Sequence, residues 1–503
     1  MRNLFYIGIA TLVSNLINSQ TLNDLSYMTF SSLNGSARYK SMAGAFGALG
    51  GDLSSISNNP AGSSVFLYNE IGASINYNSK NVKGIYSDQP RTIQDEDFYF
   101  DQFGSVFVFN NTNEKSSWKR ITASISVNRI TSFDQRSSIN GAGKNSISDY
   151  FLYYADGVPL EDIQIYDDEI ISDIYSYLGE EIGFDAQQAF LGYQSYIIDP
   201  LTNNLSERSY VSNIKSDRFN HILSQFNEGY HRKTSFNFSG LYKDFLHLGF
   251  NINQHKIEFS NLKDFYEKEH EPNSLVSNVN FENSLLSFGQ GYSLQFGAIL
   301  KFDNLRLGLV YDSPQWINIA DETQQKISSF RYDNGISIKE ILEPNVINSF
   351  SPYELRIPAK SGISFAYILN KKGLLSVEYN YQNLSNIKLN SESISSYLDE
   401  LISNSQQAFT SVNIIKFGSE YRIEDLSLRA GYYQRSNSKR DIFKNDNSLT
   451  FGIGFDFGSS NFSVSFIQSK INQNLQLFSA GLTDEYDLEN KFTELTLSYN
   501  IKF

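Results

Sequence analysis

The chain has 503 residues, no cysteine and a formal net charge of −14. The lack of cysteine excludes a disulfide framework and thiolate metal sites, and the acidic balance argues against nucleic acid as a main partner. Aromatic residues make up 15% of the chain and only nine residues are proline, which argues against disorder. Beyond residue 20, no apolar run reaches the ~18 residues that a membrane-spanning helix needs. The chain is therefore either a large soluble β-protein or a protein that crosses a membrane as strands.

The first 20 residues have the pattern of a secretory signal peptide. A short positive start, Met1-Arg2-Asn3, precedes a mostly apolar stretch at 4–16, and Ser19-Gln20 offers a cleavage point. A buried first helix is the alternative interpretation. We expect residues 1–20 to be removed and the mature chain to lie outside the cytoplasm, without a lipid anchor because there is no cysteine to carry one.

Alternating segments recur along the rest of the chain. At the C-terminus, Leu495, Leu497, Tyr499 and Ile501 share one face of a strand, and polar residues fill the other face. A two-residue period over ~9–11 residues is what a membrane-spanning strand requires. Segments with this pattern lie at 65–78, 101–110, 119–131, 232–242, 244–258, 288–302, 304–313, 361–371, 373–384, 411–423, 425–436, 447–458, 460–470 and 492–503.

The connections between these segments alternate in length. Every second one is a short turn, such as Phe302-Asp303-Asn304, whereas the intervening ones are long, at 79–100, 132–231, 259–287, 314–360, 385–410, 437–446 and 471–491. Outer-membrane barrels have short periplasmic turns and long outer loops, and a sheet can span hydrocarbon only if it closes. We therefore predict an all-β fold in which residues 65–503 form a 14-stranded antiparallel transmembrane β-barrel with long extracellular loops, notably 132–231.

Residues 21–64 differ from the barrel because they neither alternate nor carry many charges. They are rich in small residues at 43–52 and 58–62. A phosphate-binding loop is excluded because no strand precedes these glycines and no lysine follows them, and a flexible linker is the bland alternative. A 14-stranded barrel is wider than the eight-stranded kind that its own side chains fill. We therefore expect residues 21–64 to be a hatch, or plug, in the lumen.

A family resemblance rests on this segment. The run from Ala43 to Asp52, the box Asn59-Pro60-Ala61-Gly62 before the first strand, and the stretch from Gly308 to Pro314 resemble the FadL/TodX/OMPP1 outer-membrane transport family. The resemblance covers essentially the whole mature chain. The chain is similar above all to the Bacteroidetes-type members of this family, which are often labelled hemin receptors. The final Phe503 is similar to the C-terminal aromatic residue that the barrel assembly machinery recognises.

The resemblance implies a function and a place in the cell. The family takes up hydrophobic small molecules, such as long-chain fatty acids, passively across the bacterial outer membrane. Ligand binds in the lumen against the hatch and leaves sideways through a gap in the wall. The resemblance implies no enzyme activity, no cofactor and no metal. The hatch residues that we single out are Phe46, Gly47, Asn58, Asn59, Pro60, Ala61 and Gly62.

Four charged or titratable residues on polar strand faces are candidate lumen contacts: His247, His255, Arg306 and Arg429. The two histidines share one face, so either could serve as a haem ligand, although polar wall is the simpler interpretation. The arginines could meet a ligand carboxylate, but ion pairing across the wall is favoured. Neither a His-Glu-x-x-His nor a Gly-x-Ser-x-Gly motif occurs, so these catalytic signatures are absent. An outer-membrane phospholipase stays open as an alternative.

Residues 145–207 hold thirteen aspartates and glutamates and no lysine or arginine. Ile163, Tyr166, Ile170 and Ile174 recur at helical spacing, which predicts an amphipathic helix at about 160–182. We expect this stretch to pack over the lumen. Its acidic residues either bind divalent cations shared with lipopolysaccharide or only keep the surface anionic.

Two other functions stay open. The chain could be a barrel partner or shuttle in a type IX-like secretion system, with an outer-membrane protein docked on the outer loops, or a nonspecific porin or hemin channel. The partners that we expect are a hydrophobic ligand, outer-membrane lipid, lipopolysaccharide and the barrel assembly machinery, and no nucleic acid.

Overall fold

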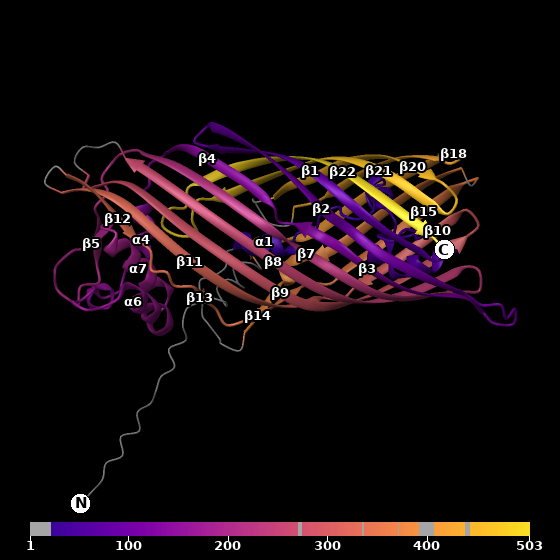
Figure 1. The fold of residues 1–503 in the computed structure, drawn as a ribbon, viewed down its shortest axis with the longest axis horizontal. Helices are drawn as coiled ribbons and strands as arrows, with labels where there is room; N and C mark the ends of the chain where they lie inside the picture. Colours follow the sequence, from indigo (N-terminus) through magenta and orange to yellow (C-terminus); the bar gives the residue numbers. More distant parts are fainter. Residues whose placement is uncertain (1–21, 270–273, 334–335, 371, 392–406, 438–442) are drawn as a thin grey trace, which may run out of the picture.

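The computed structural model describes residues 22–269, 274–333, 336–370, 372–391, 407–437 and 443–503. Its centre is a closed antiparallel barrel (Figure 1), in which each strand pairs with the next and the last pairs with the first, as in Ala73 opposite Tyr499. This confirms the predicted fourteen strands. They are β1 (Glu70–Tyr86), β2 (Gln89–Asn110), β3 (Trp118–Ser132), β7 (Phe219–Tyr242), β8 (Leu246–Glu269), β9 (Val276–Phe302), β10 (Leu305–Asp312), β15 (Lys360–Leu369), β16 (Gly373–Asn383), β18 (Ser411–Ile423), β19 (Leu426–Arg435), β20 (Phe443–Asp456), β21 (Ser460–Gln476) and β22 (Glu485–Lys502).

Side-chain alternation separates a lipid-facing surface from a polar lumen. On β8, Leu248, Phe250 and Ile252 are 40%, 41% and 49% exposed, whereas Asn251 and His255 between and beyond them are buried. Exposed apolar residues recur at the same height on the other strands, for example at Leu449, Phe451 and Ile453 of β20, and form a continuous apolar belt. An apolar belt around a closed polar interior is the arrangement of a membrane-spanning barrel. Among the described residues, no helix combines the length and the apolar character needed to span a bilayer.

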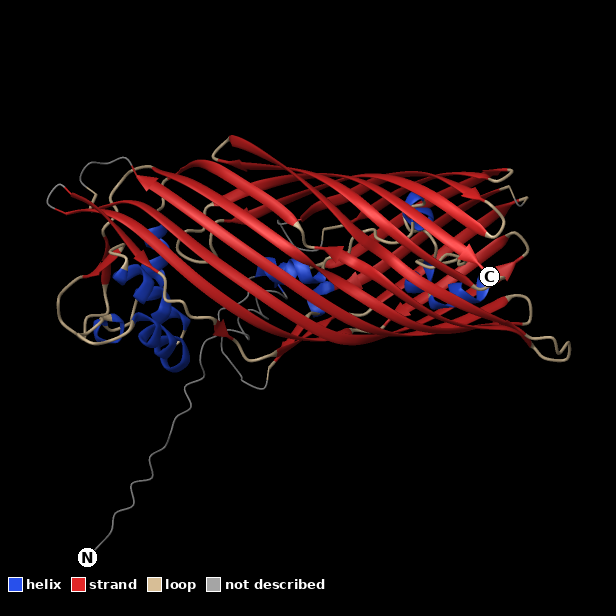
Figure 2. Ribbon diagram, viewed as in Figure 1, coloured by secondary structure: helices blue, strands red, loops and turns tan. Residues whose placement is uncertain are grey.

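The strands continue far beyond this belt at the end opposite the C-terminus (Figure 2). Strands β8 and β9 have 24 and 27 residues, against the ~9–11 that span a bilayer. The expectation of a loop at 79–100 is therefore wrong, because β1 and β2 run on to a tight turn at Ser87-Asp88, where both residues have positive φ. Most of 259–287 and 471–491 likewise lies in strands. The first strand begins at Glu70 rather than at residue 65.

Further strands extend the wall above β10, where β11 takes over as the partner of β9. These elements and a short 3₁₀ helix are β11 (Gln315–Asp333), β12 (Ile336–Leu342), β13 (Asn348–Ser349), β14 (Tyr353–Ile357), η3 (Leu384–Asn386) and β17 (Lys388–Asn390).

The long excursion between β3 and β7 begins with β4 (Gln135–Gly143) and then forms a helical cap at residues 144–214. The predicted single helix at 160–182 is wrong, because the chain turns away between two shorter helices and leaves Tyr166 and Ile170 exposed while Ile163 and Leu178 are buried. The elements of the cap are α4 (Ile147–Ala155), α5 (Leu160–Ile163), α6 (Ile171–Tyr177), the π-helix η2 (Leu178–Ile182), α7 (Phe184–Gln194), β5 (Ile198–Pro200) and β6 (Tyr210–Ser212).

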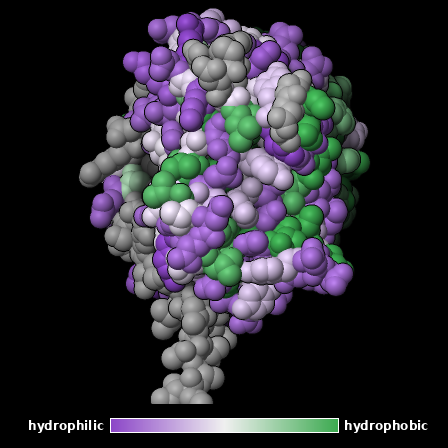
Figure 3. Space-filling view, turned by 90° about the vertical axis from the view of Figure 1, so that its left-hand side faces the viewer, coloured by the Kyte–Doolittle hydropathy of each residue, from purple (hydrophilic) through white to green (hydrophobic). Residues whose placement is uncertain are grey.

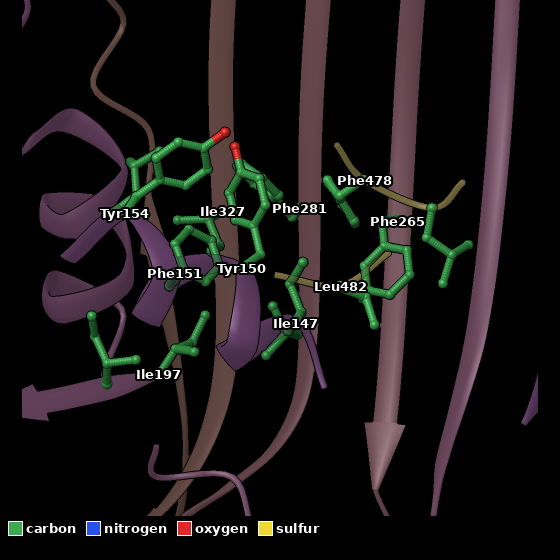
Figure 4. Close-up of a cluster of buried hydrophobic side chains, with 14 of the residues drawn as sticks. Ile147, Tyr150, Phe151, Tyr154, Ile197, Phe265, Phe281, Ile327, Phe478 and Leu482 are labelled. Carbon is green, nitrogen blue, oxygen red and sulfur yellow. The ribbon is translucent and has the colours of Figure 1, made fainter. Parts of the chain in front are cut away.

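The cap packs against the inward face of the extended strands (Figure 4). Tyr150 and Phe151 of α4 contact Phe281 of β9, with ring centroids 5.7 and 5.3 Å apart, and Phe265 and Phe478 complete the cluster. Burial raises the pKa of the Tyr175 hydroxyl, which therefore stays a donor to Gln325 of β11 at 2.7 Å. The outer end of the lumen is thus closed on this side by a packed apolar core.

The segment before β1 lies inside the barrel, where Figure 1 shows it in indigo. We call residues 22–65 the plug. It contains α1 (Leu22–Thr29), α2 (Ala37–Ser41), α3 (Ser55–Asn58) and the 3₁₀ helix η1 (Pro60–Val65). Most residues from Gly35 to Ser64 are buried, because the inward residues of the strands surround them.

Candidate functional site

Asn59 connects two parts of the plug to the barrel wall. Its amide nitrogen donates to the carbonyl of Gly47 at 2.7 Å and to the carbonyls of Ala298 and Leu309 at 3.3 Å, and its oxygen accepts from the Ala61 amide at 3.1 Å. A buried side chain with all of its groups bonded holds the backbone in one arrangement. Asn59 therefore fixes the plug at the junction of β9 and β10.

Glycines on the inner wall make room for this junction. A Cβ atom on Gly297 would lie 1.9 Å from the Asn59 oxygen, and a Cβ atom on Gly308 would lie 2.2 Å from the Gly47 carbonyl oxygen. On β8, a Cβ atom on Gly249 would lie 2.5 Å from the carbonyl carbon of Pro60. No other residue type permits so close an approach of plug and wall.

The remaining residues of the box begin the 3₁₀ helix η1. Pro60 occupies its first position, with Asn59 as the N-cap, where a fixed φ and a missing N–H are favourable. The Pro60 carbonyl accepts from Asn237 of β7 at 2.9 Å, and the Gly62 carbonyl accepts from the Gly51 amide at 3.1 Å. The box thus brings the end of the plug back against the glycine-rich run.

Buried ion pairs fasten the plug on two further sides. Lys40 lies 3.1 Å from Asp101 and 2.6 Å from Glu494, and Arg38 lies 2.9 Å from Glu420. Removing one partner of a buried pair leaves an uncompensated charge and costs about 3–5 kcal/mol. These contacts therefore oppose the release of the whole plug.

Another buried carboxylate, Glu378, holds the centre of the plug. Glu378 accepts from the Gly47 amide at 2.7 Å and from the Asn58 side chain at 2.9 Å, and it pairs with Lys416 at 2.8 Å. Phe46, fully buried beside them, packs against Tyr39 with ring centroids 5.4 Å apart. The structure thus brings Phe46, Gly47 and Asn58 together with the box.

Three of the four candidate lumen contacts face the plug. Arg306 donates to the Leu49 carbonyl at 2.7 Å, Arg429 pairs with Glu420 at 2.7 Å, and the His247 ring lies 2.7 Å from the Ser64 hydroxyl. Their polar groups therefore bind plug and wall. His255 lies about 26 Å farther along β8 than His247, at ~3.3 Å per residue, so the two histidines cannot share a ligand.

His255 lines a cavity of about 150 Å³ between the barrel wall and the plug, whose residues 28–34, 54 and 57–58 also line it. Its Nδ1 lies 3.0 Å from Nε2 of His231, and its Nε2 lies 2.8 Å from the Ser293 hydroxyl. The Nδ1 atom of His231 is buried without a hydrogen-bond partner among the described residues. Several charged residues complete a polar lining, which includes Lys233, Asp312, Lys360 and Lys416.

Lys233 differs from the other lysines of this cavity, which we call the upper cavity. Lys360 pairs with Asp312 at 2.9 Å, and Lys416 pairs with Glu378. Lys233 donates to the Ser57 carbonyl at 3.1 Å, and in the described part of the chain no carboxylate lies within ion-pair distance of it. Lys233 is not among the site residues predicted from the sequence. Its place on the polar face of a predicted strand is the feature that indicates a lumen position.

An apolar sleeve lies beside the upper cavity, and α1 fills it. Leu25 and Met28 of α1 are fully buried against inward residues of the walls, among them Ile257, Phe259 and Ile317. The lumen therefore changes from polar around η1 to apolar around α1. In this structure the N-terminal helix occupies the apolar part.

A second cavity, of about 100 Å³, lies on the other side of the plug segment 30–34. Phe30, Ser32 and Leu33 line both cavities, so this short segment separates them. The Ser32 amide donates to the Ile130 carbonyl at 3.1 Å. Ile130 sits at a β-bulge of β3, where the ladder is interrupted and its carbonyl is open to the plug.

The wall beside this second cavity has an incomplete ladder, which we call the seam. Strand β2 pairs with β3 only from Gln102 to Asn110, and from Gln89 to Asp101 its described partner is β1 alone. The Lys80 ammonium group donates across the seam to Asp97 on one side and to the Asp134 carbonyl on the other. Side chains rather than backbone bonds thus close the wall there.

The fold has known relatives among solved structures. No protein-family model and no curated protein matches the chain. A FadL homologue of Pseudomonas aeruginosa aligns with 94% of this chain and 99% of its own at 11% identity and a TM-score of 0.54. The toluene transporter TodX of P. putida aligns with 94% and 99% at 13% identity and a TM-score of 0.51. With its apolar belt, the protein is thus a barrel of the bacterial outer membrane with the FadL/TodX fold.

Proposed function

We propose that this protein is an outer-membrane channel for the passive uptake of amphipathic acids, such as long-chain fatty acids. Lys233 is the observation that carries the proposal. A half-buried cation without a carboxylate partner is unfavourable, and a ligand carboxylate in the upper cavity would compensate its charge. The apolar sleeve beside the cavity suits the hydrocarbon chain. The two neighbours with this fold, a FadL homologue and a toluene transporter, support uptake of hydrophobic compounds in general.

Ligand entry requires α1 to leave the sleeve. Cavities of about 150 and 100 Å³ are smaller than the ~300–1,000 Å³ of typical small-molecule pockets. Displacing α1 exposes the side chains around Leu25 and Met28 to the alkyl chain. Burial of each methylene group then contributes about 0.8 kcal/mol, which offsets the loss of the α1 contacts.

We further propose that the ligand leaves through the seam. The plug segment 30–34 would shift, break its bonds to the Ile130 carbonyl and join the two cavities. The ligand would then reach the seam, where Arg129 packs on the Tyr99 ring at 4.2 Å and Lys80 bridges both sides. We predict that neither a cofactor nor a catalytic group takes part in this transport.

The test compares ligands with and without a carboxylate. We expect Lys233→Met to weaken the binding of a long-chain fatty acid at least tenfold, because a charge-assisted bond is worth about 1.5–3 kcal/mol. Binding of the hydrocarbon of equal length should change little. Lys256→Met, on the outward face of β8, is the matched control. Equal losses for acid and hydrocarbon, or no loss for either, would contradict the proposal.

Docking of a protein partner at the outer end is the second candidate. Figure 3 shows hydrophobic patches scattered over this face, and the cap exposes Ile170, Tyr177 and Leu201 at 62%, 57% and 63%. Exposed apolar patches rimmed by polar residues often mark interaction sites. Cross-linking in native membranes, followed by mass spectrometry, would identify a stoichiometric partner on the cap if this function holds, and would return only lipid or no adduct if it does not.

A further inference from the structure

Two lysines face each other on the outer surface of the barrel wall. Lys470 of β21 lies directly opposite Lys491 of β22 in the antiparallel register, and both are exposed. Cβ atoms of opposite residues are ~4.5–5.5 Å apart, and like charges in such pairs are destabilising. The pair is therefore unfavourable unless an anion lies between the two side chains.

The neighbouring described side chains do not supply that anion. In the next row above the pair, the outward residues are Lys83 of β1, Glu489 of β22 and Asn472 of β21. Glu489 already pairs with Lys83, at 3.8 Å. The row below holds Thr493 and Gln468, which carry no charge. Within these rows of β1, β21 and β22, three described lysines share one carboxylate, although the chain has a formal net charge of −14.

The height of the lysine pair identifies the source of the missing anion. The outward face of β21 reads Phe466, Gln468 and Lys470, and Phe466 belongs to the apolar belt. The four residues from Phe466 to Lys470 cover about 13 Å along the strand. Because the strands are tilted, the rise along the membrane normal is smaller. The ammonium groups therefore lie in the headgroup layer, just above the hydrocarbon. This is the outer leaflet, because the C-terminus and the short turns lie at the other end of the barrel.

We propose that Lys470, Lys491 and Lys83 form a binding site for the phosphorylated headgroup of an outer-leaflet glycolipid of the lipid A type. A phosphate seated between Lys470 and Lys491 accepts charge-assisted hydrogen bonds from both and removes their repulsion. The acyl chains of the same lipid lie along the apolar belt below, beside Phe466 and Leu495.

A second pair of opposed cations provides an internal contrast. Arg232 of β7 lies opposite Lys256 of β8, four residues beyond Ile252 of the apolar belt. Lys256, however, pairs with Glu258 at 2.6 Å, and Arg232 packs on the Tyr230 ring at 4.4 Å. Groups of the protein itself, Glu258 and the Tyr230 ring, thus compensate the two positive charges of this pair. Replacing Arg232 and Lys256 therefore controls for a general loss of positive charge.

The experiment is native mass spectrometry of the full-length protein in detergent, titrated with bis-phosphorylated lipid A. We expect K470Q/K491Q to weaken binding at least tenfold, whereas R232Q/K256Q binds like the wild type. Equal weakening in both variants, or none in either, would overturn the proposal. Inorganic phosphate is titrated as a competitor. Displacement of the lipid at equimolar phosphate would show a free-phosphate site and would also overturn the proposal.

Thermal unfolding keeps the test independent of folding defects. Without lipid, K470Q/K491Q should melt at the wild-type temperature or above, because it removes a repulsive pair. Lipid A should then raise the Tm of the wild type and of R232Q/K256Q but not that of K470Q/K491Q. An equal rise in all three proteins would contradict the site.

Discussion

A single side chain, Asn59, decides how closely the plug and the barrel wall approach each other. It reaches carbonyls of the plug and of two wall strands, and Gly297 leaves the space that it needs. The sequence resemblance pointed to Asn59 as a hatch residue, but the residue type alone did not reveal its partners. Those partners come from strands more than 200 positions away in the chain, and their register depends on the closed barrel.

Replacing Asn59 by alanine should loosen the plug. The substitution leaves the Gly47 carbonyl and part of the wall without their donor, at a cost of about 1–3 kcal/mol. We expect cells that produce the variant to become more sensitive to bulky antibiotics that the outer membrane normally excludes. Asn113→Ala, in an exposed periplasmic turn, is the control, and equal sensitivity of the two variants would show that Asn59 does not hold the plug.

The partners of the lumen cations could not be predicted from the sequence. Alternation places Arg306, Arg429 and Lys233 on inward faces alike, and each could meet a ligand. Only the structure shows that Arg306 and Arg429 are engaged by Leu49 and Glu420, whereas Lys233 has no carboxylate partner among the described residues. Pairing across a lumen depends on which strands face each other, which a single sequence does not contain.

At the scale of elements, the helix α1 occupies the place that we assign to the ligand chain. Its buried Leu25 and Met28 contact the inward apolar residues of the upper walls. A protein whose binding-competent state is only partly populated binds with an apparent affinity reduced by that fraction. We therefore expect α1 to compete with the ligand for the sleeve.

Deletion of residues 22–29 should accordingly strengthen binding. We expect a several-fold lower apparent Kd for a fluorescent long-chain fatty acid, because the sleeve is then free before the ligand arrives. A heat-modifiable migration in electrophoresis would check that the barrel still folds. If the deletion weakens binding in a folded barrel, α1 contributes to the ligand site and does not compete for it.

The strands were predictable inside the membrane and less so outside it. Within the belt, lipid on one side and a polar lumen on the other impose strict alternation. Above the belt both faces of β1 carry polar residues, such as Lys80 and Asn81, so the pattern disappears although the ladder continues to Tyr86. The cap was missed as a packed unit because its core forms with residues such as Phe281 and Phe478, which are distant in the chain.

At the scale of the whole molecule, the lumen is layered. The part of the plug from Gly35 to Ser64, held by buried ion pairs, lies nearest the periplasmic end, followed by the upper cavity, the apolar sleeve that α1 fills and the cap. The seam borders the second cavity at the top of the apolar belt, where side chains close the wall. On the uptake route that we propose, an amphipathic acid from the outer end would meet the apolar sleeve first, then the polar upper cavity and last the seam.

The most direct test of uptake through the seam closes the seam reversibly. The chain has no cysteine, so Asp97→Cys with Asp134→Cys can be bridged selectively by a bifunctional thiol reagent with a reducible spacer. In cells without a fatty-acid channel of their own, we expect the protein to restore uptake of a labelled long-chain fatty acid. Bridging should abolish that uptake, and reduction should restore it. Uptake that continues through the bridged protein, or no uptake by the unmodified protein, would contradict the proposed route.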